Sequence, residues 1–137
     1  GLVGSEMCIR DRSKAKQFYK KIENEGLSSS NNLEIFRKVN YELLKAVNLI
    51  AQKVKGDETD SVRQRNFTKS LVIIYTIQTS LDFEKEQTSS IDFFRFYEFC
   101  RKKIISGVSF RNYKDLEKIA VNIDKLFNFN FFKSLEA

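Results

Sequence analysis

The sequence has 137 residues, of which 42% are hydrophobic and 31% charged, which is typical of one folded domain. It contains no histidine, and its two cysteines, Cys8 and Cys100, lie far apart in the chain, which argues against zinc sites and histidine-dependent hydrolases. We therefore predict that the protein is not an enzyme and needs no metal or cofactor. No apolar run has the roughly 18 residues of a membrane span, so we expect a cytosolic protein without membrane insertion.

The first twelve residues, GLVGSEMCIRDR, show neither a helical nor a strand period and lack the pattern of a signal peptide. The string resembles a translated sequencing adapter. We therefore predict that residues 1–12 are an artefactual or disordered tail, and we leave them out of the fold prediction. This leaves Cys100 as the one cysteine of the predicted domain.

Residues 13–30 form an N-terminal segment and linker in this prediction. Phe18, Tyr19 and Ile22 stand among lysines in a pattern that predicts a short amphipathic helix. A run of serine and asparagine follows Gly26 and supplies residues that favour a helix start.

The domain proper spans residues 31–137 and is predicted to contain four helices, because its apolar residues recur at intervals of three and four. Residues 71–75 include a β-branched run that also fits a strand, but the helical stripe continues for several turns on both sides. Short connections favour antiparallel packing. The prediction is an all-α fold, an antiparallel up-down four-helix bundle with a short N-terminal helical segment and helices at about 31–55, 59–84, 89–106 and 112–133.

Local signals define the ends of these predicted helices. Gly56 and Gly107 are expected to end the first and third helices. Three N-terminal signals are expected to start the later ones: these are Thr59 or Asp60, Ser89 with Asp92, and Asn112 with Asp115.

The chain has more apolar residues than one core requires. A second stripe lies outside the expected core positions and comprises Val72, Tyr75, Thr79 and Phe83 in the second helix with Phe94 and Phe99 in the third. One interpretation is a groove for an amphipathic helix of a partner protein. The other is a broad core or a contact between two copies of the chain.

The formal net charge is +6, but acidic residues separate most of the basic ones, as on an ordinary solvated surface. The best candidate for DNA recognition is the run from Arg101 to Lys103. We expect this run at a helix C-terminus, where cations interact favourably with the helix dipole. We therefore predict no nucleic-acid partner.

The stretch from Thr68 to Ile104 resembles the flagellar secretion chaperones of the FliS family, which bind flagellin before export. The family pattern is a helix ending in Ser-Leu-Asp, a turn, and then an aromatic and leucine motif with a basic pair. The corresponding residues here are Ser80, Leu81, Asp82, Phe93, Phe96, Tyr97, Lys102 and Lys103. The sequence departs from the family at Glu86-Gln87, which stand in place of Gly-Gly, and at Asn31, which stands in place of proline.

This resemblance implies a chaperone that is monomeric when free. Its partners would be the disordered C-terminal segment of flagellin and a component of the flagellar export gate. In the family, an N-terminal segment is thought to cover part of the binding surface, so Phe18, Tyr19 and Ile22 become a possible lid, with a packed helix as the other interpretation. A homodimeric helical structural or regulatory module remains the alternative function.

Overall fold

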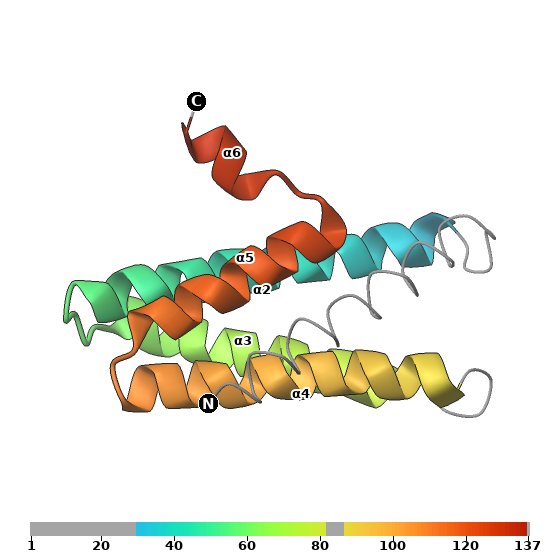
Figure 1. The fold of residues 1–137 in the computed structure, drawn as a ribbon, viewed down its shortest axis with the longest axis horizontal. Helices are drawn as coiled ribbons and strands as arrows, with labels where there is room; N and C mark the ends of the chain where they lie inside the picture. Colours follow the sequence, from blue (N-terminus) through green and yellow to red (C-terminus); the bar gives the residue numbers. More distant parts are fainter. Residues whose placement is uncertain (1–29, 82–86, 137) are drawn as a thin grey trace.

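The structure is a computed structural model that describes residues 30–81 and 87–136. The predicted tail, the predicted lid segment and residues 82–86 lie outside these residues. The described helices keep the labels of Figure 1, in which the first is α2. They are α2 (Ser30–Lys55), α3 (Ser61–Ser80), α4 (Gln87–Ser109), α5 (Tyr113–Phe127) and α6 (Phe131–Glu136).

Helices α2 to α5 form the predicted antiparallel bundle (Figure 1). α2 packs against α3 and α5, and α4 packs against the same two helices on the other side. The described residues contain no strand, so the all-α prediction is confirmed. The β-branched run at 71–75 lies within α3, where Ile74 is fully buried.

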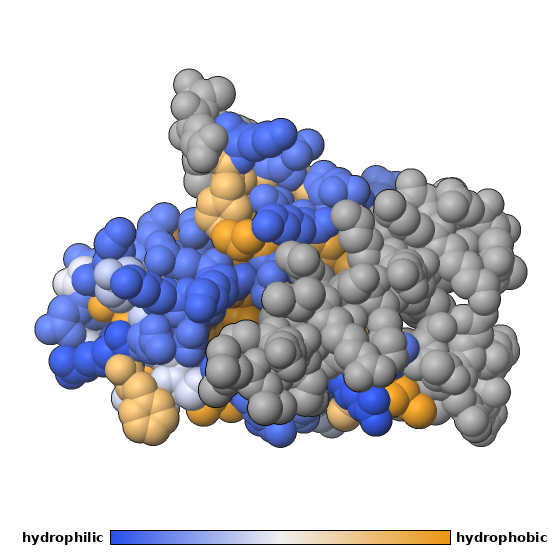
Figure 2. All heavy atoms as spheres, in the orientation of Figure 1, coloured by the Kyte–Doolittle hydropathy of each residue, from blue (hydrophilic) through white to orange (hydrophobic). Residues whose placement is uncertain are grey.

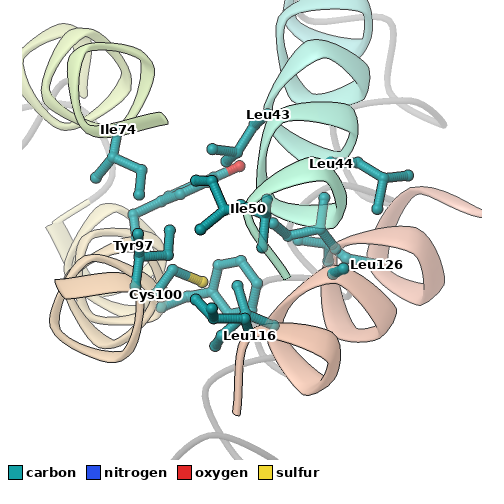
Figure 3. Close-up of a cluster of buried hydrophobic side chains, with 14 of the residues drawn as sticks. Leu43, Leu44, Ile50, Ile74, Tyr97, Cys100, Leu116 and Leu126 are labelled. Carbon is teal, nitrogen blue, oxygen red and sulfur yellow. The ribbon is translucent and has the colours of Figure 1, made fainter. Parts of the chain in front are cut away.

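One hydrophobic core lies between the four long helices. Figure 3 shows side chains from α2, α3, α4 and α5 directed toward one another. Tyr97 is fully buried, and its hydroxyl donates a hydrogen bond of 2.5 Å to Oδ1 of Asn40, which is also fully buried. Burial raises the pKa of Tyr97, so its hydroxyl stays protonated and joins α4 to α2 as a donor.

The connection between α2 and α3 agrees closely with its local sequence signals. α2 ends at Lys55 and Gly56 follows it, as predicted. Asp60 is the N-cap of α3, and its Oδ1 accepts a hydrogen bond of 3.0 Å from the backbone N–H of Arg63. α3 ends at Ser80 rather than at residue 84, because Leu81 has an extended backbone (φ −71°, ψ 134°) that does not continue a helix.

α4 differs from the prediction at both ends. It begins at Gln87, so Ser89 lies inside the helix and is not its cap. It also continues through Gly107 to Ser109. Gly107 is buried, and a Cβ at this position would lie 2.7 Å from Cγ of Leu116 in α5. This glycine therefore allows close approach of two helices instead of ending one.

The predicted helix 112–133 is two helices. Asn112 caps α5 as predicted, with its Oδ1 accepting a hydrogen bond from the backbone N–H of Asp115 at 3.2 Å. Asn128 then takes a left-handed conformation (φ 54°, ψ 48°), which ends α5 at Phe127. The short α6 begins at Phe131, whose backbone N–H donates to Oδ1 of Asp124 at 3.0 Å, and it turns away from the bundle (Figure 1).

Candidate protein-binding surface

The side of α3 that points away from the core is apolar and exposed. We call it the outer face of α3 and define it as Val72, Tyr75, Thr76 and Thr79. These positions are three and four residues apart, so they share one side of the helix. Val72 is 55% exposed and Tyr75 is 68% exposed. A large apolar side chain and an aromatic ring therefore lie next to each other in contact with solvent.

The absence of charge distinguishes this face from an ordinary helix surface. No charged residue occurs from Ser70 to Leu81, although 31% of the chain is charged. α5 shows the usual pattern, since its exposed positions are Lys114, Glu117, Lys118 and Lys125. The side of the molecule that carries α5 is accordingly mainly hydrophilic (Figure 2).

The two threonines of the outer face use their hydroxyl groups within α3. Oγ1 of Thr76 donates to the backbone oxygen of Val72 at 2.8 Å, and Oγ1 of Thr79 donates to that of Tyr75 at 2.9 Å. These bonds occupy the one proton that each hydroxyl can donate. The outer face of α3 therefore offers a partner chiefly the side chain of Val72, the ring of Tyr75 and threonine methyl groups.

Phe94 lies on the flank of α4 that adjoins α3. Its backbone oxygen accepts a hydrogen bond of 3.2 Å from Nε2 of Gln78, three residues after Tyr75. The Phe94 side chain is half-buried. Residue 94 of α4 therefore lies beside α3 at the level of Gln78, about one helical turn from Tyr75.

Phe99 lies on the other flank of α4. Five residues correspond to about 140° around a helix axis, which separates Phe99 from Phe94. Nζ of Lys103 lies 5.8 Å from the centre of the Phe99 ring and 3.6 Å from Oδ2 of Asp115 in α5. Phe99 is therefore on the α5 side of the molecule, away from the outer face of α3.

The structure thus brings together Val72, Tyr75 and Thr79 on α3, with Phe94 beside the adjoining seam. Phe83 and Asp82 lie outside the described residues, as do the possible lid residues Phe18, Tyr19 and Ile22.

The aromatic residues of the family-like motif belong to the core. Phe93, Phe96 and Tyr97 are at most 1% exposed, and the ring of Phe93 stacks on that of Tyr97 at 5.5 Å. Leu81 is half-buried against the same core, and the exposed Ser80 donates its hydroxyl to the backbone oxygen of Ile77. Most of this motif therefore has a structural role in the bundle.

The expected helix-end role of Lys102 and Lys103 is wrong. α4 continues to Ser109 and has no basic residue in its last turn, whereas the helix dipole acts mainly within that turn. Lys102 is exposed, and Lys103 instead pairs with Asp115 on the neighbouring helix.

Sequence reasoning missed Ile35 as a surface residue. Its side chain is 58% exposed on α2, next to the half-buried Phe36, which packs against the core. The signal available in the sequence was an apolar residue directly before the core residue Phe36. Ile35 belongs to the side of α2 that adjoins α3, so it extends the exposed apolar surface beyond α3.

Within residues 30–81 and 87–136, no three His, Cys, Asp or Glu side chains are grouped so that they could hold a metal ion. None of the helices described has the length and apolar character needed to cross a membrane. Comparison of the chain with models of known protein families, with curated proteins and with solved structures finds no match.

Proposed function

We propose that this protein is a non-enzymatic chaperone that binds an amphipathic helical segment of another protein on the outer face of α3 and the adjoining α4 seam. The observation that carries this proposal is the uncharged, exposed face formed by Val72, Tyr75, Thr76 and Thr79. The sequence resemblance to flagellar secretion chaperones suggests the C-terminal segment of flagellin as the partner.

The composition of this face agrees with the known properties of protein interfaces. Charged residues are depleted at the centre of such interfaces, and tyrosine is among the residues that contribute most to affinity. A disordered partner pays about 2–5 kcal/mol to become ordered when it binds. Burial of apolar surface returns about 25 cal/mol for each Å², so a helix that covers several apolar side chains can offset this cost.

The proposed cellular role follows from the resemblance. The protein would hold newly made flagellin in the cytosol, prevent its premature polymerisation and bring it to a component of the export gate. A monomeric chaperone leaves the outer face of α3 open to flagellin. A homodimer would cover the same apolar residues with a second copy, which is the competing use of this surface.

Calorimetric titration with the C-terminal segment of flagellin from the same genome tests the proposal. We expect one segment to bind each chain, and we expect Tyr75→Ala to weaken binding. The matched control is Phe110→Ala, which removes an aromatic ring that is 81% exposed on the loop between α4 and α5. Equal binding by both variants would argue against the outer face of α3. A dimeric mass by light scattering, lost in Tyr75→Ala, would instead support self-association.

A further inference from the structure

A second surface forms where α2 and α3 lie side by side. Its residues are seven positions apart on each helix, and it shares Thr76 with the outer face of α3. We call it the α2–α3 face. Each helix contributes three side chains at least partly open to solvent, with a charged residue in the middle and uncharged residues on either side. The α2–α3 face consists of Ile35, Glu42 and Leu49 from α2 and Val62, Lys69 and Thr76 from α3.

One ion pair shows how the two helices align. Nζ of Lys69 lies 3.0 Å from Oε2 of Glu42. Because α2 and α3 run in opposite directions (Figure 1), seven residues back along α2 corresponds to seven residues forward along α3. Ile35 is therefore level with Thr76, and Leu49 is level with Val62. These levels are about 10.5 Å from the central pair, since each residue advances a helix by about 1.5 Å.

The centre of the face carries a surplus of positive charge. Glu42 is paired with both Lys69 and Lys45, the second at 3.1 Å. Hydrogen bonds from Lys69 and Lys45 lower the pKa of Glu42, so its carboxyl is ionised at neutral pH. Two lysines and one glutamate leave a local charge of +1. All three side chains are between 42% and 48% exposed, so they remain accessible to a partner.

We propose that the α2–α3 face binds an amphipathic helix that has one carboxylate in the middle of its apolar side and an apolar residue seven positions before and after it. Ile35 and Leu49, which are 58% and 37% exposed, provide the two apolar contacts. The lysines beside Glu42 provide the charge that complements the carboxylate. Seven-residue spacing is the repeat with which helices pack along one another.

This inference rests on the proposed function, because it takes the partner to be a helical segment, and it specifies the sequence of that segment. A helix with lysine at the central position would place three cations around one carboxylate. A helix with only apolar residues there would cover two lysines that share the single carboxylate of Glu42, and burying this surplus charge is costly. The α2–α3 face therefore discriminates between helices that are equally hydrophobic.

Two synthetic helical peptides of about three heptads test the proposal. They share apolar residues seven positions on either side of the centre and differ only in having Glu or Lys at the centre. We expect the Glu peptide to bind the full chain about five-fold more tightly, as befits partly exposed ion pairs. This preference should shrink in high salt, which screens exposed charges.

Charge reversal in the protein locates the contact. Lys69→Glu should reverse the preference between the two peptides. Lys118→Glu, at an exposed position of α5, changes the net charge equally and should leave the preference intact. Circular dichroism and thermal melting establish that both variants fold. If neither peptide binds, if both bind equally, or if Lys69→Glu and Lys118→Glu have the same effect, the proposal is wrong.

The outcome for flagellin separates this inference from the proposed function. Flagellin binding that depends on Tyr75 but not on Lys69 would support the proposed function and overturn the α2–α3 face as its docking site. Dependence on both residues supports both proposals. Peptide discrimination without any binding of flagellin would retain the α2–α3 face and reject flagellin as the partner.

Discussion

Tyr75→Ala removes the more exposed of the two large hydrophobic side chains on the outer face of α3, so its effect on binding can be separated from its effect on folding. A tyrosine buries about 150–250 Å² when it is fully covered. Because 68% of Tyr75 is exposed in the free protein, about 100–170 Å² remains for a partner to cover. At about 25 cal/mol for each Å², this area corresponds to at most about 2.5–4 kcal/mol.

The measured loss of affinity should be smaller than this upper limit. Binding also restricts the side chains that meet at the interface, so we expect Tyr75→Ala to weaken flagellin binding by about 1–3 kcal/mol. Calorimetry measures this loss. Urea unfolding of the free protein should change much less, because the ring leaves no cavity in the core.

Phe93→Ala provides the opposite case. Phe93 is 1% exposed and packs against the rings of Tyr97 and Phe36, so its truncation should lower the free energy of unfolding by about 3–5 kcal/mol. The assignment of Tyr75 to a binding surface is refuted if Tyr75→Ala destabilises the free protein as much as Phe93→Ala and leaves affinity unchanged. That result would place Tyr75 in a structural contact rather than at a binding surface.

Three further predictions concern the bundle itself. Gly107→Ala should lower the melting temperature, since overpacking against α5 costs about 1–3 kcal/mol and outweighs the roughly 1 kcal/mol gained in helix propensity. An unchanged or higher melting temperature would show that α4 and α5 can separate without cost. Tyr97→Phe should lower the free energy of urea unfolding by about 1–3 kcal/mol, because Oδ1 of Asn40 loses its buried donor; no loss would mean that another donor replaces it. Asp60→Asn should reduce the acid sensitivity of unfolding. Lys53 holds the pKa of Asp60 below its usual 3.8, so the unfolded chain takes up the proton first and this stabilisation is lost as the pH falls below about 4. Identical pH profiles of unfolding for the two proteins would contradict this prediction.

Local sequence signals predicted the helix boundaries where the boundary depends on local contacts. Asp60 and Asn112 cap helices because their side chains accept hydrogen bonds from backbone groups three residues later, and such bonds need no contact with distant parts of the chain. Gly56 likewise follows α2 in a turn made by neighbouring residues. These positions could be read from sequence alone.

Other boundaries depend on contacts or conformations that periodicity does not contain. Gly107 has the residue type of a helix end, but its place is set by Leu116 on the next helix. Asn128 interrupts an apolar pattern that continues through Phe129 and Phe131, so the period predicted one helix where a left-handed residue divides two. A single sequence does not show which asparagine will adopt that conformation.

Part of the candidate surface could be predicted from periodicity, and part depends on how the helices pack. Periodicity identified Val72 and Tyr75 as surplus to the core, and both are exposed. It did not determine which flank of α4 adjoins α3, and that arrangement places residue 94 beside α3 and Phe99 on the α5 side. Ile35 was missed because its significance depends on the pairing of α2 with α3, which the ion pair between Glu42 and Lys69 defines.

The division of apolar residues within α3 supports the proposal that its outer face contacts another protein. α5 buries its large aliphatic residues and exposes charged ones, which is sufficient for a helix that only completes a core. α3 buries Ile74 and Ile77 but leaves Val72 and Tyr75 in solvent, with no charged residue between them. An exposed apolar surface promotes association, and lysine or glutamate at these two positions would prevent it without disturbing the buried residues. The absence of such charges along three turns of α3 is explained if another chain covers this surface.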